Sequence, residues 1–142
     1  MKAMSRPCPG RFRIALCCLA ALAAALTAAP AAAAPGVSCH VDYGGERRVI
    51  RAAATQDPYR MAPVAIGSYF LFRVVVEHPS RPLAGVKVTT YADAEGGPVP
   101  LHIAHHPQPV RNRGRFGFTG EQFVYEPVRD GELVYWCAVD SR

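Results

Sequence analysis

Residues 68–77 read Ser-Tyr-Phe-Leu-Phe-Arg-Val-Val-Val-Glu, and this segment has the strongest strand character in the chain. Its β-branched and aromatic side chains suit the pleated surface of a sheet. Successive side chains of a strand point to opposite faces. One face is apolar throughout and consists of Phe70, Phe72, Val74 and Val76. The opposite face is interrupted by Arg73 and Glu77, so the segment predicts a strand that buries one face in a core.

Similar segments lie on both sides of residues 68–77. They are residues 37–43, 46–55, 86–92, 99–106, 116–125 and 133–139. Turn signals rich in glycine and proline separate them, and no segment has the periodicity of an amphipathic helix. In residues 99–106 we expect Val99, Leu101 and Ile103 to point inward. Short strands separated by turns predict an all-β chain, folded as an antiparallel β-sandwich of about seven strands.

The length of 142 residues allows one domain of ordinary size. The net charge of +5 is unevenly distributed along the chain. Four of the 16 Lys and Arg lie in residues 1–33, which contain no Asp or Glu. Residues 34–142 contain the other 12 Lys and Arg and all 11 Asp and Glu. The predicted domain, residues 34–142, is therefore nearly neutral. This balance disfavours nucleic-acid binding by a basic surface.

Residues 1–33 have the organisation of a secretory signal peptide. The segment begins with basic residues, continues with the uncharged apolar residues 14–29 and ends in small residues at Ala33. We expect cleavage after Ala33 and export to the bacterial periplasm, with an extracellular destination as the alternative. Retention of the segment as a membrane anchor is a second alternative. After cleavage we expect no membrane span, because no other apolar run approaches the roughly 20 residues that a span needs.

Two cysteines remain in residues 34–142, namely Cys39 and Cys137. An even pair in an oxidising compartment predicts a disulfide. Both residues fall on the predicted inward faces of the first and last strands, so the bridge joins these two strands. The alternative, a redox-active or metal-binding pair, has no Cys-x-x-Cys motif to support it.

Two stretches resemble known β-sandwich families. Residues 135–139, Tyr-Trp-Cys-Ala-Val, resemble the Tyr-x-Cys ending of immunoglobulin domains, in which the tyrosine forms a tyrosine corner. Residues 81–97 resemble a strand, turn and strand of transthyretin-like and carboxypeptidase-regulatory-like sandwiches. Both resemblances imply an immunoglobulin-like β-sandwich. Neither implies a catalytic residue, since such folds serve many functions.

The most unusual cluster is His102-Ile-Ala-His105-His106. On a strand His102 and His106 point to the same face and His105 to the other. Two imidazoles on one face predict a copper or zinc site if another segment adds ligands. The further donors that we consider are His40 and Met61. The alternative is a solvated strand end without metal.

Partner binding is predicted from exposed basic and aromatic side chains. Arg111, Arg113 and Arg115 form a basic tip suited to a carboxylate, a phosphate or an acidic partner. Tyr59 and Arg60 join this tip if both loops lie at the same end of the sandwich. Trp136 is expected to face away from the core, because Cys137 faces inward, and tryptophan is a frequent anchor of interfaces.

Enzyme signatures are missing from the sequence. No serine lies in a nucleophile elbow, and neither a phosphate-binding glycine loop nor a His-Glu-x-x-His motif occurs. We therefore expect an exported, non-enzymatic binding or accessory module that acts on another periplasmic protein. The alternative is a periplasmic copper- or zinc-binding protein that uses His102, His105 and His106. The sequence does not specify an oligomeric state.

Overall fold

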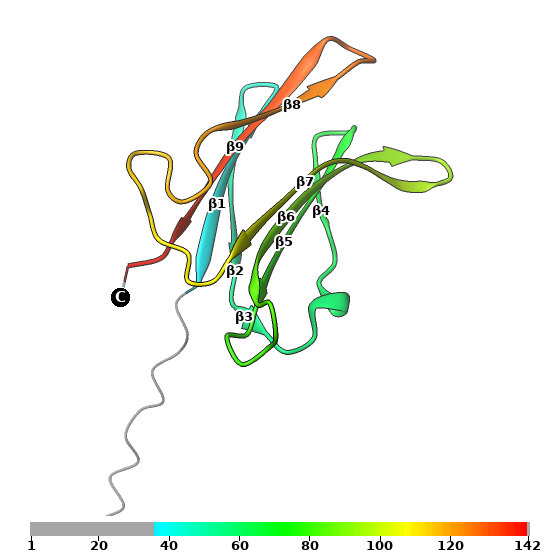
Figure 1. Ribbon diagram of the computed structural model, residues 1–142. Coiled ribbons are helices and arrows are strands. Elements are labelled where there is room, and N and C mark those ends of the chain that lie inside the picture. Colours follow the sequence, from blue (N-terminus) through cyan, green and yellow to red (C-terminus); the bar gives the residue numbers. More distant parts are fainter. Residues whose placement is uncertain (1–35, 142) are drawn as a thin grey trace, which may run out of the picture. The chain divides into compact units, whose positions relative to one another are not determined.

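The computed structural model describes residues 36–141 (Figure 1). The predicted signal peptide, residues 1–33, lies outside the described residues. The described residues belong to one compact unit, Ala32–Arg142. They form strands and one short 3-10 helix, η1, at Pro58–Arg60.

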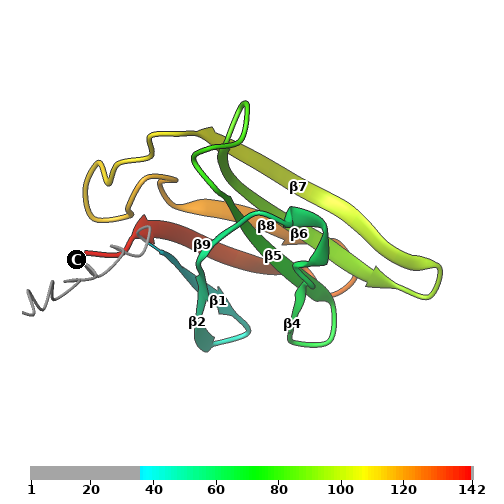
Figure 2. The ribbon, with the colours of Figure 1, turned by 90° about the horizontal axis from the view of Figure 1, so that it is seen from below.

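Two sheets make up the described part of the chain. The first sheet has the order β2-β1-β9-β8 and contains β1 (Val37–Tyr43), β2 (Glu46–Ala52), β8 (Gln122–Glu126) and β9 (Gly131–Val139). The second has the order β3-β5-β6-β7, with β4 also paired to β5. It contains β3 (Ala54–Thr55), β4 (Val64–Ile66), β5 (Phe70–Glu77), β6 (Gly85–Ala94) and β7 (Gly97–Pro107). Figure 2 shows the sheets as two layers.

The all-β sandwich predicted from the sequence is confirmed. Within residues 36–141 seven strands have five residues or more, namely β1, β2, β5, β6, β7, β8 and β9. All their pairings are antiparallel, and the one parallel pairing joins the two-residue β3 to β5. Four pairs of consecutive long strands are hydrogen-bonded, namely β1–β2, β5–β6, β6–β7 and β8–β9, and the last strand, β9, lies beside the first, β1.

The core lies between the inner faces of the two sheets. The face of β5 predicted to be buried is buried, with Phe70 and Phe72 at most 1% exposed. The ring of Phe72 meets the ring of Tyr135 edge to face, with the centroids 5.1 Å apart. Since Phe72 belongs to the second sheet and Tyr135 to the first, this contact joins the two layers.

The disulfide joins the first and last strands as predicted. Cys39 on β1 lies opposite Cys137 on β9, and their sulfur atoms are bonded at 2.00 Å. Both residues are fully buried in the core. The bridge therefore closes almost the whole described chain, because its two cysteines are 98 positions apart in the sequence.

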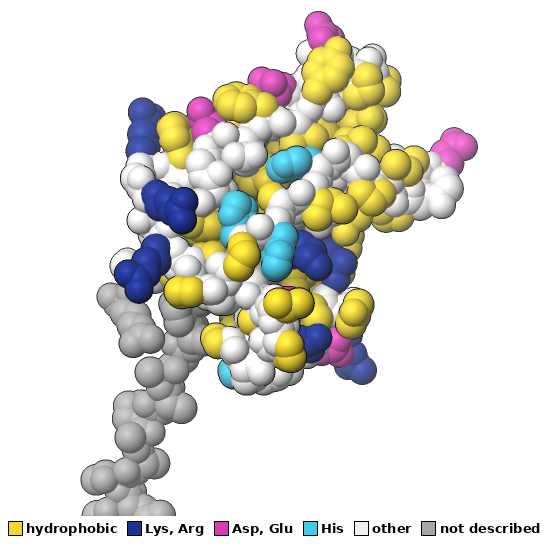
Figure 3. All heavy atoms as spheres, viewed as in Figure 1, with side chains coloured by type: hydrophobic (Ala, Val, Ile, Leu, Met, Phe, Trp, Pro, Cys, Tyr) yellow, Lys and Arg dark blue, Asp and Glu magenta, His cyan; other side chains and the backbone are white. Residues whose placement is uncertain are grey.

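The inward positions predicted for β7 are wrong. Val99, Leu101 and Ile103 are 41% to 59% exposed. Figure 3 shows hydrophobic side chains on the surface of the β6–β7 hairpin. β7 has a register shift opposite Thr90 and Tyr91, and beyond it the register places His102, and not Ile103, opposite the fully buried Thr90. The inward positions are taken by the histidine rings, which pack on aromatic residues of the core.

Two other segments differ from their predicted boundaries. The strand expected over residues 116–125 is limited to β8, and residues 116–121 belong to the loop after β7. The strand expected over residues 46–55 is divided at Ala53 into β2 and β3, which belong to different sheets. In residues 36–141 no helix has the length and apolar character required to cross a membrane.

Candidate functional site

The outer face of the first sheet carries a stacked pair of rings. His40 on β1 lies opposite Trp136 on β9, one position from the disulfide pair. Because Cys39 and Cys137 face the core, these two neighbours face outward. Their ring centroids are 3.9 Å apart and their planes differ by 10°. Register and alternation therefore bring an imidazole and an indole into face-to-face contact.

The loop of residues 108–121 extends this row of rings. Phe116 meets Trp136 edge to face at 6.2 Å, and the guanidinium of Arg115 lies 5.1 Å above the Phe116 ring. A cation above a ring is attracted by the negative face of its π system. We call His40, Trp136, Phe116 and Arg115 the outer-face cluster.

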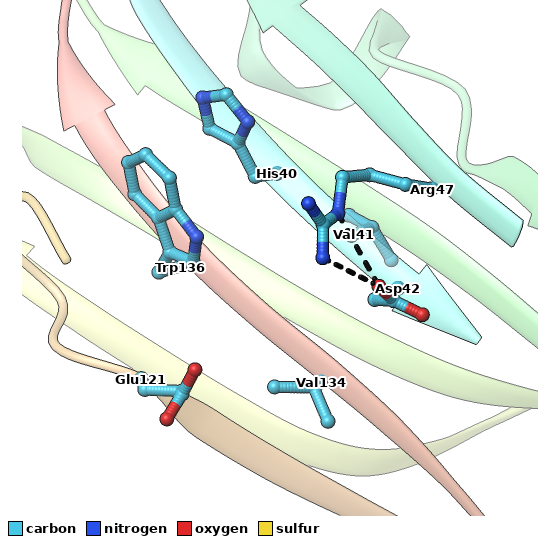
Figure 4. A pocket seen from close by; sticks show the side chains of 7 residues that line it. All are labelled: His40, Val41, Asp42, Arg47, Glu121, Val134 and Trp136. Carbon is cyan, nitrogen blue, oxygen red and sulfur yellow. Dashed lines mark hydrogen bonds and ion pairs between the residues drawn. The ribbon is translucent and has the colours of Figure 1, made fainter. Parts of the chain in front are cut away.

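Charged side chains of both signs border the outer-face cluster (Figure 4). Arg47 forms an ion pair with Asp42 at 3.0 Å, and its side chain is 74% exposed. Glu121 lies across the hollow from this pair. Two shallow hollows, of about 160 and 190 Å³, share the edge of the cluster. This surface therefore combines aromatic rings with charged donors and acceptors.

Hydrogen bonds to β9 fix the loop of residues 108–121. The Asn112 side chain donates to the Val139 carbonyl at 3.0 Å and accepts from the Val139 N–H at 2.8 Å. Phe118 N–H donates to the Cys137 carbonyl at 2.9 Å, and Cys137 N–H donates to Thr119 Oγ1 at 2.8 Å. The loop is therefore held in register beside the strand that carries Trp136.

Gly117 is required by this attachment. Its φ is +61°, a left-handed value that favours glycine. A Cβ at this position lies only 2.1 Å from the Cys137 carbonyl oxygen. The backbone of the loop can thus approach β9 only because residue 117 has no side chain.

The basic tip predicted from the sequence extends over more than one hollow. Arg111 and Arg113 line one hollow together with His106, and Arg113 and Arg115 line another. Arg115 also belongs to the outer-face cluster. No described carboxylate pairs with any of the three arginines.

The predicted association of Tyr59 and Arg60 with this tip is wrong. Both residues lie in η1, and Arg60 pairs with Asp57 at 3.1 Å. Tyr59 and Pro58 line a hollow over β5 and β6 on the outer side of the second sheet. Arg73 fixes η1 there by donating to the Pro58 carbonyl at 2.5 Å. Figures 1 and 2 both show η1 and the loop of residues 108–121 on different sides.

The histidines proposed as metal ligands lie on different faces. His102 and His106 point inward from β7 and His105 points outward, as their spacing predicts. His40 stacks on Trp136 on the outer side of the other sheet, so the structure does not bring it to His102 or His106. Within residues 36–141 no group of three or more His, Cys, Asp or Glu is placed to hold a metal ion. Binding of copper or zinc, with Met61 as a further donor, stays a prediction that a metal titration can test.

The two inward histidines contact aromatic residues. His102 Nδ1 lies 3.2 Å from the Tyr135 hydroxyl, and the His106 ring meets Phe118 edge to face at 5.1 Å. Burial raises the pKa of Tyr135 well above its usual value, so this hydroxyl keeps its proton. It bonds to a histidine, and not to the backbone as a tyrosine corner does.

Glu126 is a buried charged residue that was not predicted from the sequence. Glu126 is fully buried, and its carboxylate accepts a hydrogen bond from the Tyr43 hydroxyl and pairs with Arg129 at 2.9 Å. The hydrogen bond with Glu126 raises the pKa of Tyr43. The three residues lie where β1 and β8 end, so the cluster joins the ends of two strands and the following turn.

A serine and histidine pair occurs elsewhere but lacks an acid. His78 Nδ1 lies 2.8 Å from Ser80 Oγ in the exposed turn after β5. The Ser80 N–H also donates to His78 Nδ1, and Gln56 donates to Ser80 Oγ. No described carboxylate bonds to His78, so the pair lacks the acid that orients the base in a hydrolase. These bonds stabilise the turn.

Comparison with known families, curated proteins and solved structures finds no match for this chain. A function must therefore be argued from the described residues themselves. Among their features the outer-face cluster combines aromatic rings, an exposed arginine and a fixed backbone.

Proposed function

We propose that this protein is an exported, non-enzymatic binding module that acts on another periplasmic protein. The observation that carries the proposal is the outer-face cluster, in which Trp136 stacks on His40 beside Phe116 and Arg115. Tryptophan, tyrosine and arginine dominate the binding energy of protein interfaces. The segment of residues 1–33, which has the organisation of an export signal, supports the periplasmic location.

The fixed backbone of the cluster also supports binding. A surface that is already ordered loses little conformational freedom when a partner docks. Here β1 and β9 are joined by a disulfide next to His40 and Trp136, and the loop that carries Arg115 is hydrogen-bonded to β9. Arg47 and Glu121 supply charges of both signs at the rim, where they select a partner of complementary pattern.

Cross-linking in cells tests the proposal. A photoreactive phenylalanine analogue replaces Val49 in one strain and Tyr59 in a control strain. Val49 lies on β2 directly opposite His40, so it borders the outer-face cluster without belonging to it. Both residues are exposed, but Tyr59 lies on η1 beside the other sheet. We expect a discrete cross-linked protein from position 49 and its absence from position 59. Equal products from both positions, or none from position 49, would contradict the proposal.

A further inference from the structure

The hollow that Arg111, Arg113 and His106 line has a volume of about 370 Å³ and lies where β7 ends and the loop of residues 108–121 begins. Arg111, Asn112 and Arg113 line one part of it, and His106 and Phe118 also contribute to the lining. No acidic residue lines this hollow. It is therefore a concave surface with two positive charges and no internal counter-charge.

The backbone that carries the two arginines is held in place. Asn112, which lies between them in sequence, makes two hydrogen bonds to Val139. Arg113 N–H donates to the Gly117 carbonyl at 2.9 Å. Neither Arg111 nor Arg113 forms an ion pair with a described carboxylate. Their guanidinium groups are available to a ligand without the loss of an internal pair.

His106 contributes its ring to the wall of the same hollow. Its Nε2 is buried away from solvent and has no hydrogen-bond partner among the described residues. Burial lowers the pKa of His106, and the charges of His105, Arg113 and His102 lower it further. The ring is therefore an uncharged part of the wall at neutral pH, and the positive charge of the hollow comes from the two arginines.

We infer that this hollow binds one oxyanion group, a phosphate or a carboxylate, through Arg111 and Arg113, with the His106 ring in the wall of the hollow. A guanidinium group presents parallel N–H donors that match two oxygens of such an anion. The inference goes beyond the proposed function, because neither arginine belongs to the outer-face cluster.

Nuclear magnetic resonance titration tests the inference on oxidised residues 34–142, which contain the whole described core. Sulfate represents a phosphate group and acetate represents a carboxylate. Chloride at matched ionic strength is the control anion, and passage of protein and buffers over a chelating resin beforehand removes metal ions without adding a carboxylate. We expect saturable shifts of the amide signals of residues 111–113 and of the His106 ring. Tighter binding of sulfate indicates a phosphate group as the natural ligand, and tighter binding of acetate indicates a carboxylate.

Substitution of both arginines separates specific binding from general salt effects. Arg111→Gln with Arg113→Gln is expected to weaken the tighter-binding anion about tenfold or more, since two charge-assisted bonds are lost. Arg60→Gln, on η1, removes one positive charge elsewhere and is expected to leave binding unchanged. Shifts that do not saturate, that chloride reproduces, or that persist in the double variant would overturn the inference. Cross-linking at position 49 does not depend on this result, so the two proposals fail separately.

Discussion

Trp136 is the single tryptophan of the chain, so the residue at the centre of the outer-face cluster is also an optical probe. Its indole is stacked on His40 and only partly exposed to water. Replacement of His40 by alanine is expected to shift the fluorescence emission to longer wavelength, because water then reaches one face of the indole. His78→Ala, in a distant exposed turn, serves as the control. An unchanged emission spectrum in His40→Ala would show that the rings are not stacked in solution.

The lowered pKa of His106 is expected to make the free energy of unfolding depend on pH. Its folded-state pKa lies below the usual value of 6.5, mainly because burial disfavours the charged ring. The unfolded state therefore binds the proton more tightly, so the contribution is complete above about pH 6.5 and is lost as pH falls through the folded-state pKa.

Urea unfolding between pH 7.5 and 5.5 measures this effect. We expect the free energy of unfolding of the oxidised protein to decrease over this range. The decrease should be smaller in His106→Gln, whose side chain does not titrate. Identical pH profiles for the two proteins would contradict the buried position of the ring.

Residue-level features were only partly predictable. The sequence correctly predicts that Trp136 faces outward, because Cys137 must face the core. The sequence also contains a signal for the stacked rings. If Cys39 and Cys137 pair across adjacent antiparallel strands, the next residue pair is His40 and Trp136. Glu126 was not predictable, since its partner Tyr43 is 83 positions away and the pairing depends on how the strand ends meet.

At the scale of elements, β7 provides the sharpest contrast between sequence and structure. Hydrophobic alternation alone predicts that Ile103 is inward, yet Ile103 is 59% exposed. Its neighbours His102 and Ala104 take the inner positions. The difference arises because the register shift in β7 places His102 on the inner side, and because imidazole rings pack well against Tyr135 and Phe118. A rule that places all apolar residues inside cannot anticipate this.

Matched threonine substitutions test the phase of β7. Ile103→Thr is expected to change the free energy of unfolding by no more than about 0.5 kcal/mol, as is usual for exposed positions. Val88→Thr, on the paired strand β6, introduces a hydroxyl at a fully buried position and is expected to cost about 1–3 kcal/mol. Chemical denaturation of the two variants measures the difference. A larger loss in Ile103→Thr than in Val88→Thr would indicate that the predicted inward phase was correct after all.

At the scale of the whole molecule, one covalent bond joins the two ends of the described chain. The disulfide spans 98 positions, and the chain-entropy model gives up to about 4.7 kcal/mol for a loop of this size. This is a large part of a domain stability of about 5–15 kcal/mol. We expect Cys39→Ala with Cys137→Ala to lower the urea midpoint strongly. An equal midpoint for this variant and the oxidised protein would show that the core alone holds the sheets together.

The overall architecture was predictable because two independent patterns agree on it. Alternation in residues 68–77 and 133–139 defines buried faces, and the two cysteines connect the first strand to the last. The distribution of the basic tip over several hollows was not predictable, because it depends on how Asn112 and Phe118 attach the loop to β9. The sites of a loop depend on contacts that have no periodic signal in the sequence.

The central claim is that the outer-face cluster captures a periplasmic protein. Immobilised oxidised protein is exposed to periplasmic extract, and retained proteins are quantified for the parent, Trp136→Ala, Arg115→Ala and Tyr59→Ala. We predict one protein that the parent and Tyr59→Ala retain equally and that both cluster variants lose by about 30-fold or more, as for hot-spot residues. Retention of the same protein by the folded Trp136→Ala and Arg115→Ala variants would contradict the account.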